Sequence, residues 1–109
     1  MLASTPSYVV RGMQDFIQAQ GQVVHYIPSD AAVTSFDTHA RVRYLSAVEL
    51  ANAIEAYPLE VTFDARDFPT REPAKGDSVV IDGGRRGVML VRHVRLSGQL
   101  VAYKLAVQG

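Results

Sequence analysis

The sequence predicts a mostly β (α+β) fold: a small β-barrel or sandwich of about six strands, with an N-terminal helix and one short internal helix. Six segments rich in β-branched and aromatic residues follow one another, separated by Gly, Pro, Asp and Ser turn signals at short spacing. Helices do not regularly separate these segments, which argues against a parallel α/β sheet. The 109 residues fit a single domain over 1–109, with residues 1–6 expected to form a flexible arm.

The N-terminal helix is predicted over residues 7–20. Ser7 can cap its first turn, and Gly21 is a natural stop. Gly12 in the interior costs about 1 kcal/mol relative to alanine. The apolar residues recur at helical spacing and form one stripe, which consists of Val9, Val10, Met13, Phe16 and Ile17.

The predicted strands are recognised by alternation and by the turns between them. They cover residues 22–27, 40–45, 59–63, 78–81, 87–94 and 100–107, with surface loops at 31–38 and 66–75. Residues 82–84 (Asp-Gly-Gly) predict a hairpin turn, and 97–98 (Ser-Gly) predict another turn.

Two of these strands indicate which face they bury. In the strand over 40–45, Val42 and Tyr44 alternate with two arginines, a pattern typical of a half-buried strand. In the last strand the predicted inner face consists of Val101, Tyr103, Leu105 and Val107.

The internal helix begins at a capping box formed by Ser46 and Glu49, and it is expected to end near residue 56, before Pro58. Its polar positions are three residues apart and cover roughly 120° of its surface. The remaining surface is apolar and consists of Val48, Leu50, Ala51, Ala53 and Ile54, with Tyr57 at the end. Such a helix is either wedged within its own domain or covered by another subunit, and both interpretations remain open.

Charge is balanced overall but unevenly distributed. Eleven basic residues match eleven acidic ones, yet residues 49–82 contain eight acidic and three basic residues, and residues 83–109 contain five basic residues and no acidic one. The two segments could pair across a sheet within one subunit. Alternatively, they could meet between subunits, or the basic segment could face nucleic acid.

Few residues carry a pattern that indicates catalysis. The absence of cysteine excludes disulfides, thiolate metal sites and cysteine nucleophiles. The three histidines, His25, His39 and His93, lack the spacing of a metal site. No phosphate-binding loop or nucleophile elbow is present. We therefore expect no enzymatic activity, no cofactor and no metal site.

The remaining acidic and targeting patterns are equally unspecific. Asp64, Asp67 and Glu72 do not match a calcium loop, and a solvated loop is expected there. The first residues do not form a signal peptide, and no apolar stretch approaches about 20 residues, so no membrane partner is expected.

Arginines are concentrated near the predicted hairpin. Arg85 and Arg86 are expected at its tip, with Arg92 and Arg95 further along. Such a β-ribbon could contact phosphates, but its arginines are not interleaved with aromatic residues as in single-strand binders. Solvated turn charge is the favoured interpretation.

Several segments resemble a known family. Residues 59–64 (Leu-Glu-Val-Thr-Phe-Asp), a proline-containing loop, residues 75–84 (Lys-Gly-Asp-Ser-Val-Val-Ile-Asp-Gly-Gly) and residues 91–94 (Val-Arg-His-Val) resemble the small head–tail joining proteins of long-tailed bacteriophages. These are the head-completion, stopper or connector proteins. Residues 16–26 are also similar. Arg86-Gly87 stands where such proteins often carry an aromatic residue, so the branch stays open among stopper, adaptor and tail terminator.

The resemblance implies a structural virion protein made in the host cytoplasm and located in the phage neck. It would form a homo-oligomeric ring that joins the portal or adaptor protein to tail proteins, around a channel for double-stranded DNA contacted without sequence specificity. The candidate interface consists of Val48, Leu50, Ile54, Tyr57, Arg85 and Arg86. The candidate channel or docking loops contain Phe36, Asp67, Arg71 and Lys75. A nucleic-acid-binding barrel and a small enzyme or ligand-binding barrel are the alternatives.

Overall fold

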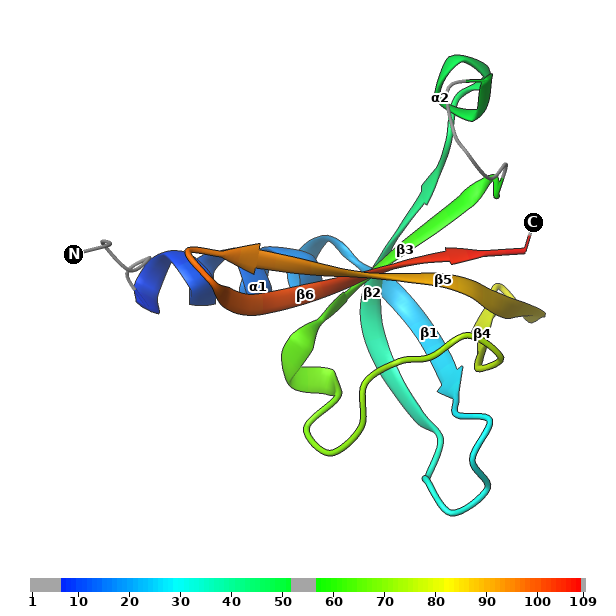
Figure 1. Cartoon of the computed structure of the whole chain (residues 1–109), viewed down its shortest axis with the longest axis horizontal. Helices are drawn as coiled ribbons and strands as arrows, with labels where there is room; N and C mark the ends of the chain where they lie inside the picture. The colour runs from blue at the N-terminus through cyan, green and yellow to red at the C-terminus, as the bar shows by residue number, and fades with distance from the viewer. Residues whose placement is uncertain (1–6, 52–56, 109) are drawn as a thin grey trace.

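Six antiparallel strands close into a barrel in the order β1-β2-β3-β6-β5-β4, with β4 pairing back onto β1 (Figure 1). The structure is a computed structural model that describes residues 7–51 and 57–108. Its elements are α1 (Ser7–Gln20), β1 (Gln22–Ile27), β2 (Phe36–Tyr44), α2 (Ala47–Ala51), β3 (Leu59–Asp64), the 3-10 turn η1 (Ala65–Asp67), β4 (Ser78–Ile81), β5 (Gly84–Leu96) and β6 (Gln99–Val107). The predicted mostly β fold, with one N-terminal and one short internal helix, is confirmed. The predicted arm over 1–6 lies outside the described residues.

Both predicted tight turns are present, and their backbone explains their sequence. Ile81 pairs with Gly84 across the first turn, and Leu96 pairs with Gln99 across the second. The two residues inside each turn have positive φ angles, 51° and 80° at 82–83 and 50° and 82° at 97–98. A two-residue hairpin loop requires this conformation, and glycine adopts it without steric cost at the second position.

The barrel interior follows the alternation of the strands. The four residues expected on the inner face of β6 are all buried, as predicted. Three of them, Tyr103, Leu105 and Val107, pack with a large set of apolar residues from the other strands, namely Val24, Tyr26, Ala40, Leu59, Val61, Phe63, Val79, Ile81 and Val88. This core fixes the register of each strand, because a shift by one residue would turn its apolar side chains outward.

Strand β5 is longer than the sequence predicted. It starts at Gly84 and ends at Leu96, with irregular register between Val88 and Leu90 and again between Val94 and Arg95. Bulges of this kind bend a strand, so β5 can pair with β4 at one end and with β6 along the rest. The expectation that two arginines form the hairpin tip is therefore wrong, because residues 85–86 lie inside the strand.

Helix α1 covers one end of the outer face of the sheet. Val10 and Ile17 are buried against Val101 and Ala102. The Gln14 side chain is also buried and donates a hydrogen bond to a β6 carbonyl. The rest of the predicted apolar stripe stays exposed: Val9 by 41%, Met13 by 37% and Phe16 by 51%.

Strand β2 differs from its prediction at both ends. It begins at Phe36, inside the expected loop over 31–38, because residues 36–40 pair with β1. At its other end Tyr44 is 67% exposed rather than half-buried. Tyr44 is the last residue of the strand, at the point where the chain leaves the barrel.

Candidate functional site

Helix α2, in the connection between β2 and β3, stands away from the barrel (Figure 1). We call this connection, residues 45–58, the α2 arm; residues 45–51 and 57–58 of it are described. The backbone amide of Leu45 donates to the Pro58 carbonyl at 2.8 Å, and Tyr44 pairs with Leu59, so the two sides of the arm meet at its root.

The predicted capping box is confirmed at the start of α2. The Glu49 amide donates to Ser46 Oγ at 3.2 Å, and the Ser46 amide donates to Glu49 Oε2 at 2.8 Å. Glu49 Oε1 also accepts from Arg43 at 2.8 Å. The Ser46 amide and Arg43 together lower the pKa of Glu49. These contacts orient the first turn of α2 relative to β2.

The described part of the α2 arm exposes apolar surface. Val48 is 70% exposed, and it follows the exposed Tyr44 by four residues. Tyr57 is half-buried where the chain returns to β3. The Leu50 side chain and all of Ile54, which belong to the predicted interface, lie outside the described part of the chain. Where α2 is described, the barrel does not enclose it.

A second exposed surface lies beside α1 on the outer face of the sheet. We call it the α1 groove; it encloses about 380 Å³ and is lined by Met13, Phe16, Ile17, Arg41, Arg43, Glu60, Thr62, Val94, Ala102 and Lys104. Apolar side chains come from α1 and from the sheet floor. The charged side chains come from β2, β3 and β6.

Basic residues form a row across four strands next to this groove. Arg41 pairs with Thr62, Thr62 pairs with Lys104, and Lys104 pairs with Arg92. Neighbouring strands are about 4.8 Å apart, so Lys104 and Arg92 place like charges directly opposite each other, which is unfavourable. Glu60 lies 3.9 Å from Lys104 and 3.8 Å from Arg43. It is the one acidic side chain lining the groove.

The charges of the acidic segment (49–82) and the basic segment (83–109) are only partly neutralised by ion pairs between the two segments. Within the described residues, Glu60 with Lys104 is the one Asp or Glu to Lys or Arg ion pair that joins the acidic and basic segments. Arg85 and Arg92 form no ion pair with any described residue. Of the two arginines predicted for the interface, Arg85 is exposed, whereas Arg86 is half-buried and donates to the Gln108 carbonyl at 3.3 Å.

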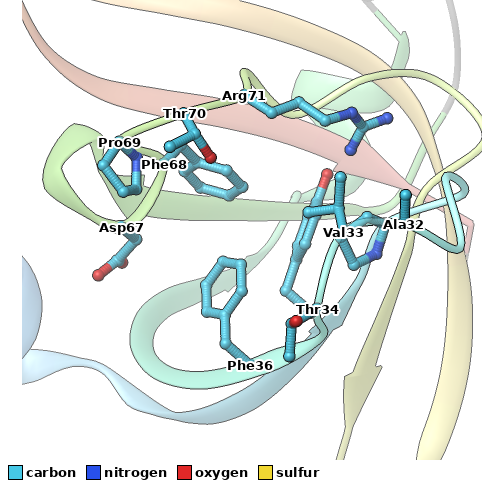
Figure 2. Close-up of a pocket in the computed structure, with 11 residues that line it drawn as sticks. Ala32, Val33, Thr34, Phe36, Asp67, Phe68, Pro69, Thr70 and Arg71 are labelled. Atoms are coloured by element: carbon cyan, nitrogen blue, oxygen red, sulfur yellow. The ribbon is translucent and has the colours of Figure 1, made fainter.

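The predicted channel loops meet at one end of the barrel, around a cavity of about 410 Å³ (Figure 2). Phe68 is central to this end, since its ring lies 5.0 to 5.5 Å from four other aromatic rings, those of Tyr26, Phe36, Phe63 and Tyr103. All four contacts are edge-to-face, a favourable arrangement of aromatic rings. The cluster closes this end of the barrel.

A buried carboxylate holds the loop above the cluster. Asp77 is fully buried and accepts a hydrogen bond from the Tyr26 hydroxyl and two from Arg71, each of the latter at 3.1 Å. The amides of Ser29 and Ala74 also donate to it, at 2.8 and 2.9 Å. Burial alone would raise the pKa of Asp77, but these donors lower it to about 2. Burial and the neighbouring carboxylate raise the pKa of Tyr26.

The four predicted channel residues therefore have different surroundings. Phe36 stacks on Tyr26 at a centroid distance of 5.5 Å, and Arg71 is occupied by Asp77. Asp67 accepts from Thr38 at 2.9 Å, and its burial raises the pKa of its carboxyl group. These three line the cavity, whereas Lys75 is exposed and does not.

Asp64 corrects the expectation of a solvated acidic loop. It is fully buried and accepts from Gln18 of α1 at 2.9 Å and from Arg66 at 2.7 Å. Its Oδ1 also caps η1 through the Arg66 amide. The side chain therefore ties the end of β3 to α1 and cannot serve as a free cation ligand.

The described residues contain no group of three or more His, Asp or Glu side chains arranged to hold a metal ion. His25 lies 2.7 Å from Asp37, and His93 lies 3.4 Å from Glu72, at separate exposed positions.

None of the helices in residues 7–51 and 57–108 has the length and apolar character to cross a membrane. Comparisons with protein-family models, curated protein sequences and solved structures give no match to this chain.

Sequence reasoning missed the row formed by Arg41, Lys104 and Arg92. These residues are up to 63 positions apart in sequence, and only strand order and register bring them together. The role of Asp77 was also missed. An Asp that follows a turn glycine and precedes a strand often accepts hydrogen bonds from backbone amides of the turn, and this signal was available in the sequence. The hydrogen bond from Tyr26 to Asp77 could not be predicted, because β1 and the start of β4 are distant in the chain.

Proposed function

We propose that this chain is a structural subunit of a ring in the neck of a long-tailed bacteriophage. The ring would join the portal or adaptor protein to the tail around the channel for double-stranded DNA. The resemblance of residues 59–94 to head–tail joining proteins supports the phage assignment. The observation that carries the assembly role is the exposed apolar surface where the chain leaves β2, formed by Tyr44 at the end of the strand and Val48 in the α2 arm.

The closed barrel strengthens this argument. A closed sheet leaves no edge strand to pair with another chain, so association must use faces and projections. Large exposed apolar side chains on such projections are typical of interaction sites. The arm and the α1 groove are therefore the surfaces best suited to contact neighbouring subunits.

The test is a Val48→Asp variant studied by light scattering and by binding to purified portal and tail proteins. We expect loss of self-association or of partner binding, with an unchanged circular dichroism spectrum, because an exposed substitution changes stability by only about 0.5 kcal/mol. Val23→Asp is the matched control, since Val23 is 60% exposed on β1 and should leave assembly intact. A wild-type chain that stays monomeric and binds neither partner contradicts the proposal.

A nucleic-acid-binding module is the second candidate, favoured by the basic row across the sheet. Neutralising Arg41, Arg92 and Lys104 together should then abolish binding to duplex DNA, and wild-type affinity should fall steeply with salt. Arg85→Gln, on the other part of β5, is a suitable control. Unchanged DNA binding in the triple variant excludes this candidate.

A further inference from the structure

We propose that the cavity beside Phe68 binds an organic cation, an ammonium group carried on a short apolar chain. A free alkylamine and the side chain of a lysine from another protein share this chemistry. The inference goes beyond the proposed ring and does not depend on it, because a single subunit contains the whole cavity. Two features of the cavity carry it: an aromatic lining, and one carboxylate that has no ion-pair partner among the described residues.

The cavity has the size and the fixed walls of a small-ligand site. Its volume of about 410 Å³ lies within the range of roughly 300 to 1,000 Å³ that such sites occupy. One wall is the loop between β1 and β2, where the amides of Ala32 and Val33 donate to the side chain and the carbonyl of Asp30, at 2.9 and 3.0 Å. The other wall is the loop after η1, which the ion pair between Arg71 and Asp77 holds in place. Walls that are already ordered reduce the entropic cost of binding.

Aromatic rings supply much of the apolar lining. The rings of Phe36 and Phe68 lie at 77° to each other, with centroids 5.5 Å apart. Both side chains are half-buried, whereas Tyr26, which also lines the cavity, is fully buried. A cation within about 6 Å of a ring face is attracted by the charge distribution of the ring. Such a lining therefore suits both the apolar chain and the charge of an alkylammonium ion.

Two of the described residues that line the cavity are charged, and only one of them has a counter-charge. Arg71 donates two hydrogen bonds to the fully buried Asp77, so its charge is compensated. Asp67 accepts from the Thr38 hydroxyl at 2.9 Å but forms no ion pair with any described residue. The uncompensated charge of the lining is negative, which favours a cation over an anion.

Arg66, which precedes Asp67 in the chain, does not supply the missing counter-charge. Its guanidinium lies 2.7 Å from Asp64 and 3.2 Å from Asp15. Burial raises the pKa of the Asp67 carboxyl group, so its ionised form is less stable than that of an exposed aspartate. A bound cation would restore part of the stabilisation that this carboxylate loses by burial.

The positions of the side chains favour an organic cation over a metal ion. In Figure 2, Asp67 lies on one side of the cavity and Val33 on the other, with Phe36 and Phe68 between them. An ammonium group beside Asp67 therefore leaves its chain against the phenylalanine rings. A calcium ion needs about six oxygen ligands, and the described residues contain no group of three or more His, Asp or Glu side chains that could hold a metal.

The test is an NMR titration of the isotope-labelled full chain with n-pentylammonium chloride, compared with n-pentanol as a neutral probe of the same chain length. We expect both probes to shift the amide signals of residues 32–36 and 67–71, and the ammonium to bind about fivefold more tightly than the alcohol. Sodium chloride at matched concentration corrects for ionic strength. Equal affinities, shifts confined to other parts of the chain, or tighter binding of pentanoate than of pentylammonium overturn the inference.

Removal of the carboxylate tests the source of the preference. Asp67→Asn should abolish the preference for the ammonium and retain pentanol binding, because asparagine still accepts the Thr38 hydrogen bond through its carbonyl oxygen. Asp37→Asn is the matched control, since it removes the same charge from an exposed position outside the lining. The preference should persist in this control. Loss of the preference in both variants would indicate attraction to the overall charge of the chain and would overturn the site.

A ring variant keeps the inference testable if Asp67→Asn does not fold. Phe36→Leu preserves an apolar side chain but removes one aromatic ring, so it should weaken pentylammonium binding more than pentanol binding. Equal weakening of the two probes, together with equal affinities in the wild type, would leave an apolar cavity without cation selectivity and contradict the proposal.

A last probe distinguishes the two sources of the ammonium group. Nα-acetyl-lysine N-methylamide carries the lysine side chain between two peptide bonds. Binding at least as tight as that of pentylammonium, with the same amides shifted, supports a lysine side chain of a partner protein as the occupant. Binding of pentylammonium alone supports a free alkylamine, because the added peptide groups then do not fit the cavity.

Discussion

The fully buried carboxylate of Asp77 is the residue on which the end of the barrel depends. It joins β1 through the Tyr26 hydroxyl, the following loop through the Ser29 amide, and its own loop through Arg71. A buried carboxylate is tolerated only where hydrogen bonds and a counter-charge replace its hydration. Asp77 has both, so the ion pair with Arg71 is part of the folded structure, and the Arg71 charge is not free to act as the predicted channel residue.

We predict that Asp77→Asn destabilises the protein by about 3 kcal/mol, because Arg71 loses its counter-charge and one of the two acceptor oxygens becomes an NH2 group that faces N–H and O–H donors. The measurement is urea unfolding at neutral pH. Asp82→Asn is the control, since Asp82 is exposed in the hairpin turn and asparagine tolerates the same backbone conformation. A change below about 1 kcal/mol for the Asp77 variant would contradict this account.

The free energy of unfolding should depend on pH through the ionisation of Asp77. Its folded pKa of about 2 lies below the unfolded value near 4. The stabilisation is therefore fully present above about pH 4 and is lost as the pH falls toward about 2. Unfolding free energies measured across this interval should decline in the wild type and decline less in Asp77→Asn. Parallel curves for the two proteins would refute the assignment.

At the scale of elements, α1 is held close to the barrel by a glycine at its end. A Cβ atom on Gly21 would lie 2.7 Å from the Ile17 carbonyl oxygen and 2.8 Å from that of Ala40. Both contacts are with backbone, which cannot move without shifting α1 or β2. A Cβ atom on Gly12, inside the same helix, would meet nothing within 4 Å beyond the backbone of the helix itself.

Alanine at these two glycines should have opposite effects. Gly21→Ala should destabilise by about 1 to 3 kcal/mol through overpacking, and Gly12→Ala should stabilise by about 1 kcal/mol through helix propensity. Thermal and urea unfolding of both variants provide the comparison. The same sign for both would show that α1 is not packed against β2 as described.

The elements also show what sequence could predict. Alternation located β6 and its buried face, and the Asp-Gly and Ser-Gly pairs located both tight turns, because these signals are local. The exposure of Tyr44 could not be predicted, since the alternation of apolar and polar residues does not show at which residue a strand leaves the barrel. Likewise, the length of β5 depends on bulges, and the row of Arg41, Lys104 and Arg92 depends on register between distant strands.

At the scale of the whole molecule, the barrel has a weak seam. Strands β1 and β4 share three paired positions, whereas β3 and β6 share six and β5 and β6 share eight. Closure of the barrel therefore depends on its shortest pairing, reinforced by the link between Tyr26 and Asp77. Loss of the β1–β4 pairing would convert the closed barrel into an open sheet without unfolding β3, β5 or β6.

We predict that native-state hydrogen exchange is fastest, among paired barrel amides, at the β1–β4 seam. Fewer paired residues and less buried backbone give a smaller free energy of local opening. The amides of β6, paired on both sides, provide the internal reference. Uniform protection around the barrel would mean that it opens only by global unfolding.

The hydrogen bond from Leu45 to Pro58 extends the β2–β3 pair by one step, so residues 46–57 are inserted between two strands that are already paired. Lengthening, shortening or exchanging residues 46–57 is therefore expected to leave the strand order unchanged. Replacement of this segment by an Asn-Gly turn should yield a folded, solitary barrel. The surface that we propose for assembly can therefore vary in length and sequence while the barrel that carries it stays the same.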